Sequence, residues 1–202
     1  NLQQFHIRTI ELVIAVSVVV ISVASLFVAV YQGMVMERTL KASVWPLVQI
    51  EHGNYNPDND SRELSFTLSN LGIGAAHVRT MEITYDGESL RNMYEVMSLC
   101  CAEGETREDR QAQLLRLSQD RTLFITTTLV RDRLISPNDE NTFFHFRRGE
   151  NEDITAIWDA LDQARWEMDI KVCYCSVFED CWTIDMRSSV REEVRECAVP
   201  RD

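Results

Sequence analysis

The feature that most constrains this chain is an uninterrupted apolar segment near its start. From Leu12 to Tyr31, 20 consecutive residues carry no charge. As an α-helix, which rises 1.5 Å per residue, this segment would be about 30 Å long, the thickness of the hydrocarbon core of a bilayer. A buried helix or a signal-peptide core is the alternative, but the apolar region of a signal peptide is usually roughly 7 to 15 residues and ends at a small-x-small cleavage site. We therefore predict a retained single-pass transmembrane helix within residues 1–43.

Small side chains recur along this predicted helix at four-residue steps. They are Ser17, Ser25, Ala29 and Gly33, with Ile21 interrupting the row. Small residues at this spacing let a second membrane helix approach closely, so the row predicts packing against another subunit or self-association. The charge pattern leaves the orientation open, because basic residues lie on both sides of the segment.

Residues 44–202 are predicted to form one folded, acidic domain. Residues 42–202 hold 17 basic and 30 acidic residues, a net charge of −13, and 45% of the whole chain is hydrophobic. The apolar share predicts a packed core, and the acidity argues against nucleic acid as a partner, because phosphate binding needs clustered Lys and Arg. An acidic surface gains nothing from anionic lipids, so the domain is expected to stand off the bilayer on a helical neck at about residues 32–43.

After Trp45-Pro46 the hydrophobic period changes from helical to alternating. In Glu63 to Leu68, apolar residues alternate with polar ones, which is typical of a half-buried strand. Similar segments at residues 47–50, 77–85, 122–130 and 141–147 predict a mainly-β domain, an antiparallel sandwich. Helical spacing predicts an insertion at about residues 88–120 and a short helix at about 151–164 capped by Asn151.

Two short motifs carry a resemblance. A strand runs into Asn70-Leu71-Gly72-Ile73-Gly74-Ala75-Ala76, and this resembles a recurrent bacterial immunoglobulin-like sandwich. Trp45-Pro46 after the membrane segment, together with Cys173-Tyr174-Cys175-Ser176-Val177, is similar to uncharacterised single-pass bacterial membrane proteins with such a domain outside the cytoplasm. The resemblance implies an inner-membrane anchor and a periplasmic domain, and it implies no particular reaction.

The six cysteines are the main candidate site of the domain. On the predicted strand 166–175, the residues Trp166, Met168, Ile170, Val172 and Tyr174 share the core face, while Cys173 and Cys175 lie on the other face with Cys181 of the returning strand. A Cys175–Cys181 bridge across this hairpin is plausible, and Cys173 would then pair with Cys197, Cys100 or Cys101. The alternative is a metal site of Cys173, Cys175 and Cys181, but the spacing does not match a structural zinc site. Disulfides are favoured, and no metal or cofactor is expected.

The sequence contains no Gly-x-Ser-x-Gly, His-Glu-x-x-His, P-loop or dinucleotide-binding pattern. We therefore expect a non-enzymatic accessory or assembly subunit of a larger envelope membrane-protein complex, with the bilayer and other membrane subunits as partners. The alternative is a membrane-anchored sensor or ligand-binding module in which residues 89–119 form a pocket or lid.

Overall fold

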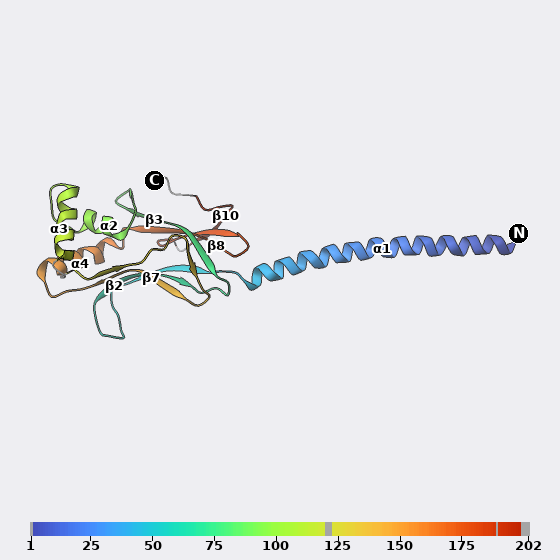
Figure 1. Cartoon of the computed structure of the whole chain (residues 1–202), viewed down its shortest axis with the longest axis horizontal. Helices are drawn as coiled ribbons and strands as arrows, with labels where there is room; N and C mark the ends of the chain where they lie inside the picture. Colours follow the sequence, from blue (N-terminus) through green and yellow to red (C-terminus); the bar gives the residue numbers. More distant parts are fainter. Residues whose placement is uncertain (1, 120–122, 189, 199–202) are drawn as a thin grey trace. The chain divides into compact units, whose positions relative to one another are not determined.

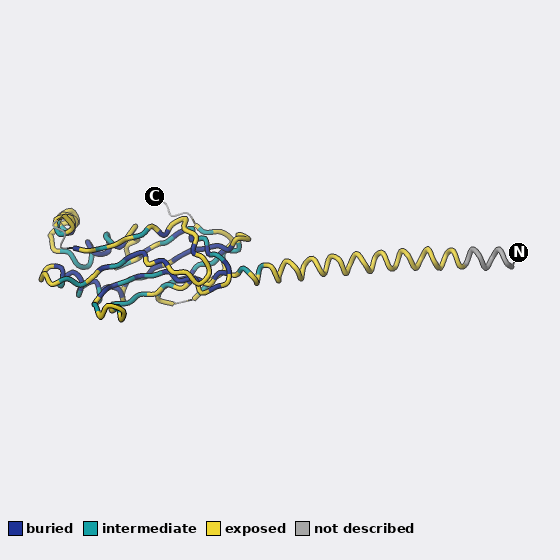
Figure 2. Tube along the Cα trace, turned by 60° about the horizontal axis from the view of Figure 1, so that its bottom comes forward, coloured by how far each residue is buried: buried dark blue, intermediate teal, exposed yellow. Residues whose placement is uncertain are grey.

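The computed structural model describes residues 2–119, 123–188 and 190–198, and it describes side chains from residue 10 onward within this range. The chain divides into two compact units, residues 1–43 and 44–202. The first unit is one helix, α1 (Leu2–Ser43), in which every side chain from Ile10 to Leu40 is exposed (Figure 2). The part from Ile10 to Ser43 is long and apolar enough to cross a membrane, and its uncharged run continues past Tyr31 to Met36.

The second unit contains two antiparallel sheets (Figure 1). The first sheet has the strand order β1-β2-β7-β5, with β1 Val48–Gly53, β2 Glu63–Asn70, β5 Ile125–Thr127 and β7 Glu140–Arg147. The second has the order β10-β9-β8-β3-β4, and β6 also pairs with β3; the bounds are β3 Ala76–Tyr85, β4 Glu88–Leu90, β6 Arg133–Ile135, β8 Asp169–Cys175, β9 Cys181–Asp185 and β10 Arg191–Val194. The prediction of an apolar N-terminal helix followed by a mainly-β domain is confirmed.

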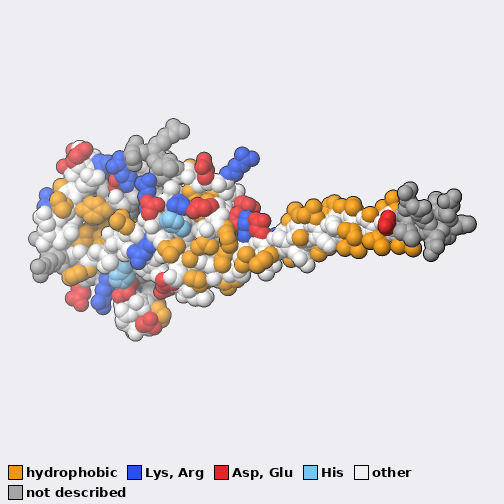
Figure 3. All heavy atoms as spheres, turned by 45° about the vertical axis from the view of Figure 1, so that its right-hand side comes forward, with side chains coloured by type: hydrophobic (Ala, Val, Ile, Leu, Met, Phe, Trp, Pro, Cys, Tyr) orange, Lys and Arg blue, Asp and Glu red, His pale blue; other side chains and the backbone are white. Residues whose placement is uncertain are grey.

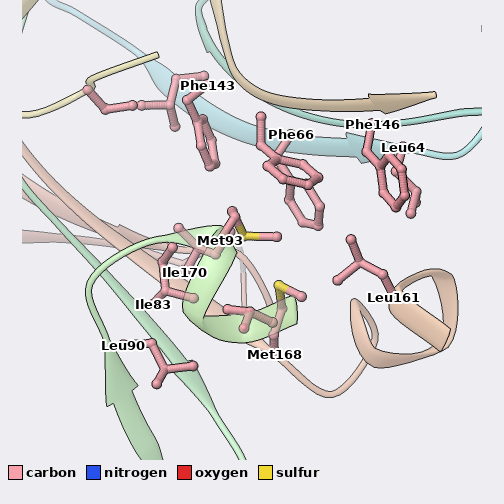
Figure 4. Close-up of a cluster of buried hydrophobic side chains, with 14 of the residues drawn as sticks. Leu64, Phe66, Ile83, Leu90, Met93, Phe143, Phe146, Leu161, Met168 and Ile170 are labelled. Atoms are coloured by element: carbon pink, nitrogen blue, oxygen red, sulfur yellow. The ribbon is translucent and has the colours of Figure 1, made fainter. Parts of the chain in front are cut away.

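The core lies between the two sheets and follows from the alternating pattern. On β2, Leu64, Phe66 and Leu68 are completely buried and point to one side, as the period of two requires. Figure 4 shows Leu64 and Phe66 with Phe143 and Phe146 of β7 on one side of this core, and Ile83 of β3 and Ile170 of β8 on the other. Burial of each large apolar side chain of this kind contributes about 1.5–3 kcal/mol.

Three helices close one end of the domain (Figure 1). In α2 (Met93–Cys100), Met93 and Met97 are buried in the core. Helix α3 (Arg107–Gln119) begins with a capping box, in which the Asp109 N–H donates to Thr106 Oγ1 and the Thr106 N–H donates to Asp109 Oδ2, both at 3.1 Å. Helix α4 (Glu152–Ala164) begins after Asn151, whose side chain accepts from the N–H groups of Asp153 and Ile154.

Two sequence-based expectations differ from the structure. Trp166 was assigned to the core face of a strand, but it is 65% exposed, because the turn that ends α4 continues through Glu167 and β8 begins only at Asp169. The strand expected over residues 122–130 is only β5, Ile125–Thr127, because the chain leaves its partner β7 after Thr127. The start of that expected strand, Thr122, lies outside the described residues.

Candidate functional site

The small-residue row lies on an uninterrupted helix. Ser17, Ser25, Ala29 and Gly33 are all exposed within α1, and a Cβ built on Gly33 meets no atom within 4 Å. The Ser17 hydroxyl donates to the Val13 carbonyl at 2.7 Å, so its polar group is satisfied within the helix. At Ser17, this surface can therefore face lipid or a second helix without leaving the hydroxyl donor unpaired.

The cysteine hairpin lies at the end of the domain where the chain continues into α1. Cys175 is directly opposite Cys181 in the β8–β9 register, and these two residues form a disulfide with a Cα–Cα distance of 4.0 Å. Cys173 is bonded to Cys197, with a Cα–Cα distance of 5.7 Å, so the C-terminal segment is joined covalently to β8. Cys173 and Cys175 lie on the face opposite Tyr174, as the alternation predicts, and both are buried.

The last two cysteines form the third disulfide of the domain. Cys100 and Cys101 are bonded to each other at the end of α2. Both are candidate partners of Cys173 in the sequence, and the structure instead pairs Cys173 with the third candidate, Cys197.

The sulfur atoms of the three hairpin cysteines and of Cys197 lie close together. The Sγ atoms of Cys175, Cys181 and Cys197 all lie within 4.8 Å of one another, and Cys175 Sγ is 3.8 Å from Cys197 Sγ across the two bridges. Thiolates in this arrangement could hold a soft metal ion, but each of these sulfurs is in a disulfide and offers no thiolate. The metal set considered from the sequence, Cys173, Cys175 and Cys181, is therefore occupied in covalent bonds.

An aromatic stack joins the first residues of the domain to its last strands. The Arg191 guanidinium lies over the Trp45 ring, 4.5 Å from its centroid, and Trp45 lies 6.2 Å from Trp182 of β9. Trp182 in turn lies 5.8 Å from Tyr174. These cation–π and ring contacts hold the chain just after α1 against β8, β9 and β10.

Asn70 organises three loops at the same end of the domain. Its buried side chain accepts from the N–H groups of Leu47 and Gly72, each at 3.1 Å, and donates to the carbonyls of Gly74, Ile135 and Ser136. The glycines of the motif pack tightly, since a Cβ on Gly72 would collide with backbone atoms of Trp45 and Leu47, and one on Gly74 with the Val44 carbonyl. The motif Asn-x-Gly-x-Gly-x-Ala thus fixes residues 44–47, where the domain begins.

Five exposed apolar side chains lie around this end of the domain, and we name them the apolar rim. They are between 46% and 64% exposed: Leu71, Ile73, Leu134, Val177 and Phe178. The register explains their proximity, because His77 near the start of β3 pairs with Leu134 on one side and with Cys175, at the base of the β8–β9 turn, on the other. Figure 3 shows uncovered hydrophobic side chains on this part of the domain.

A polar pocket lies at the opposite end of β1. It has a volume of about 510 Å³ and is lined by Asn54, Tyr55, Arg62, Trp158, Asp159, Asp162 and Gln163. None of these residues belongs to segment 89–119, which sequence reasoning had proposed as a pocket or lid. The two carboxylates are already paired, since Asp159 accepts two hydrogen bonds from Arg148 and Asp162 accepts from Arg165 and Asn54.

The wall of this pocket is stiffened by a buried arginine. Arg165 donates from Nη1 to His52 Nδ1 at 2.7 Å and from Nε to Asp162 Oδ1 at 2.7 Å. Because a guanidinium can only donate, His52 Nδ1 is the acceptor and the imidazole proton is on Nε2. Burial, followed by the charge of Arg165, lowers the pKa of His52, so the neutral ring is favoured.

Comparisons with known proteins identify no relative. No family model, no curated protein and no solved structure matches this chain.

Proposed function

We propose that this chain is a non-enzymatic accessory or assembly subunit of a larger membrane-protein complex in the bacterial envelope. In this proposal α1 is a single-pass anchor in the inner membrane, and the acidic domain is an immunoglobulin-like sandwich on the periplasmic side. Three disulfides within one domain favour an oxidising compartment, where such bonds persist.

One observation carries the proposal: α1 presents a row of small side chains on a surface that its own chain leaves uncovered. Lipid contacts do not select small residues, whereas close helix packing does.

The test compares two leucine substitutions on the same helix. Ala29→Leu places a large side chain in the row, whereas Val23→Leu enlarges an exposed side chain on the face of α1 opposite Ser25. Full-length variants are purified from native membranes in mild detergent, and stoichiometric companions, including second copies, are identified by mass spectrometry. We expect the amount of companion bound to Ala29→Leu to fall at least about ten-fold, the effect of roughly 1.4 kcal/mol of helix packing, and Val23→Leu to retain its companion. A monodisperse single chain from the unaltered protein contradicts the proposal.

The polar pocket favours a second candidate function, a ligand-binding module. Its lining combines an indole, amides, carboxylates and the Arg62 guanidinium, which suits a small polar ligand. A ligand that copurifies with the native protein and is lost in Arg62→Ala, with Arg131→Ala as the matched exposed control, would favour this candidate. Extraction of the protein without any bound small molecule counts against it.

A further inference from the structure

The backbone that carries the apolar rim is held in place by a disulfide, an ion pair and side-chain hydrogen bonds. The β8–β9 turn that carries Val177 and Phe178 is closed at its base by the Cys175–Cys181 disulfide, and its Glu179 carboxylate pairs with Arg79 at 3.0 Å. The loop that carries Leu71 and Ile73 is held by the Asn70 hydrogen bonds. The exposed side chains of these two segments therefore stand on constrained backbone, and a group of exposed apolar side chains gathered at one end of a domain is a candidate binding surface.

The length of α1 sets how far this surface lies from the bilayer. The uncharged run Leu12–Met36 has 25 residues and is about 37 Å long as a helix, which exceeds a hydrocarbon core of about 30 Å. A run that is too long can be accommodated by tilting, and when the whole run lies in the hydrocarbon core, Glu37 lies at its boundary. From Glu37 to Val44 the chain can rise only about 10 Å, and the headgroup layer itself takes up about 5 to 8 Å of that distance.

The loop that carries Leu71 and Ile73 is hydrogen-bonded to the first residues of the domain, so it lies at a similar distance from the bilayer as those residues. The Leu71 N–H donates to the Leu47 carbonyl, and the Ile73 N–H donates to the Trp45 carbonyl. If residues 44–47 lie this close to the bilayer, rim side chains that extend a few ångströms from this loop come within reach of the headgroup layer.

This end of the domain carries side chains that suit a membrane interface, together with acidic ones. Trp45 is half-exposed there, and tryptophan is enriched at the level of the headgroups. Arg131 and Arg133 are exposed just before Leu134, where they can approach lipid phosphates; Arg131 also pairs with Asp132 at 4.0 Å, and Glu179 is exposed beside Phe178.

From these observations we infer that the apolar rim lies on the headgroup layer of the bilayer that holds α1. The lipid surface then acts as a second contact beside the anchor and restricts the tilt of the domain. This conclusion replaces the expectation that the domain stands clear of the membrane on its neck. It rests on the proposed membrane anchor and does not depend on the partner of α1.

The test uses photo-crosslinking in the full-length chain. The photoreactive residue benzoylphenylalanine is placed singly at Ile73, Phe178, Tyr55 or Val28, and each protein is reconstituted in nanodiscs of phosphatidylethanolamine and phosphatidylglycerol. After illumination, intact-mass spectrometry distinguishes lipid adducts from crosslinked protein. Val28 lies within α1 and reports the anchor, and Tyr55 is an exposed aromatic residue at the other end of β1.

We expect lipid adducts at Val28, Ile73 and Phe178, with at least five-fold less at Tyr55. Lipid adducts at Val28 with only the Tyr55 level at both rim positions overturn the inference and leave the anchor intact. A protein–protein adduct at the rim positions instead identifies a second copy as the occupant and also overturns it. Absence of lipid adducts at Val28 overturns the anchor and the inference together.

Discussion

Asn70 shows how one buried amide can determine the arrangement of a whole end of the domain. Its side chain makes five hydrogen bonds to three separate loops. In Asn70→Ala the Leu47 and Gly72 N–H groups and the three carbonyls lose this partner inside the protein. Because buried unsatisfied groups are costly, we expect a loss of about 3 kcal/mol in the free energy of unfolding, measured by denaturant titration. The exposed Asn59→Ala is the control and should change stability by less than about 0.5 kcal/mol; equal effects of the two variants would contradict the role of Asn70.

Glu63 links the stability of the first sheet to pH. Its carboxylate is buried beside His145 at 3.0 Å and also accepts from Ser61 and Asn56, and hydrogen bonding, chiefly from His145, lowers its pKa to about 2. Because the pKa of Glu63 is lower in the folded protein than its ordinary value of about 4.5, the ionised carboxylate stabilises the fold fully above about pH 4.5. This stabilisation is lost as the pH falls toward 2 and the carboxylate becomes protonated. Glu63→Gln should therefore lower the free energy of unfolding by about 2 kcal/mol at pH 7 and by much less at pH 2.5. A difference between the two proteins that does not change with pH would refute this linkage.

At the scale of the element, the disulfides differ in the length of chain that they close. Cys173–Cys197 has a sequence separation of 24, whereas Cys100–Cys101 joins neighbours. Since a cross-link stabilises mainly by restricting the unfolded chain, replacing both Cys173 and Cys197 by alanine should cost about 3 kcal/mol. The paired alanine variant of Cys100 and Cys101 is the matched control, and we expect it to cost less than about 1 kcal/mol. Thermal or chemical unfolding of both variants measures the difference, and the opposite ranking would contradict it.

Local patterns predicted the elements better than the contacts between them. The alternation of Leu64, Phe66 and Leu68 and the cap at Asn151 act within a few residues, so their structural consequences are readable from the sequence. The hydrogen bond from Asn70 to Ile135 and the stacking of Arg191 on Trp45 join segments that are far apart in the sequence. No pattern within a few residues predicts such contacts. Trp166 was misplaced for a related reason, because an extended alternating pattern does not show where a preceding helical turn stops.

The candidate site was predictable in part. The hairpin geometry indicated that Cys175 faces Cys181, and the structure joins these two residues; the partner of Cys173 was left open among three residues. The polar pocket could not be anticipated, because Asn54 and Asp162 meet only through the packing of α4 beside β1.

At the scale of the whole molecule, a helix long and apolar enough to cross a membrane precedes a domain whose first residues are held by several contacts. The motif around Asn70, the Trp45–Arg191 stack and the cysteine hairpin all lie at the domain end that continues into α1. If this end rests on lipid, the remaining acidic surface is presented outward, where it can meet a partner that also rises from the membrane.

The most direct test of this account is a count of free thiols in intact cells. Cells are lysed under denaturing, non-reducing conditions with an alkylating reagent, and the labelled full-length chain is analysed by mass spectrometry. We predict that all six cysteines are protected as disulfides, as expected for a domain outside the cytoplasm. Six alkylated cysteines would contradict it, because the domain would then lie in a reducing compartment and Cys175, Cys181 and Cys197 would be free to bind a metal ion.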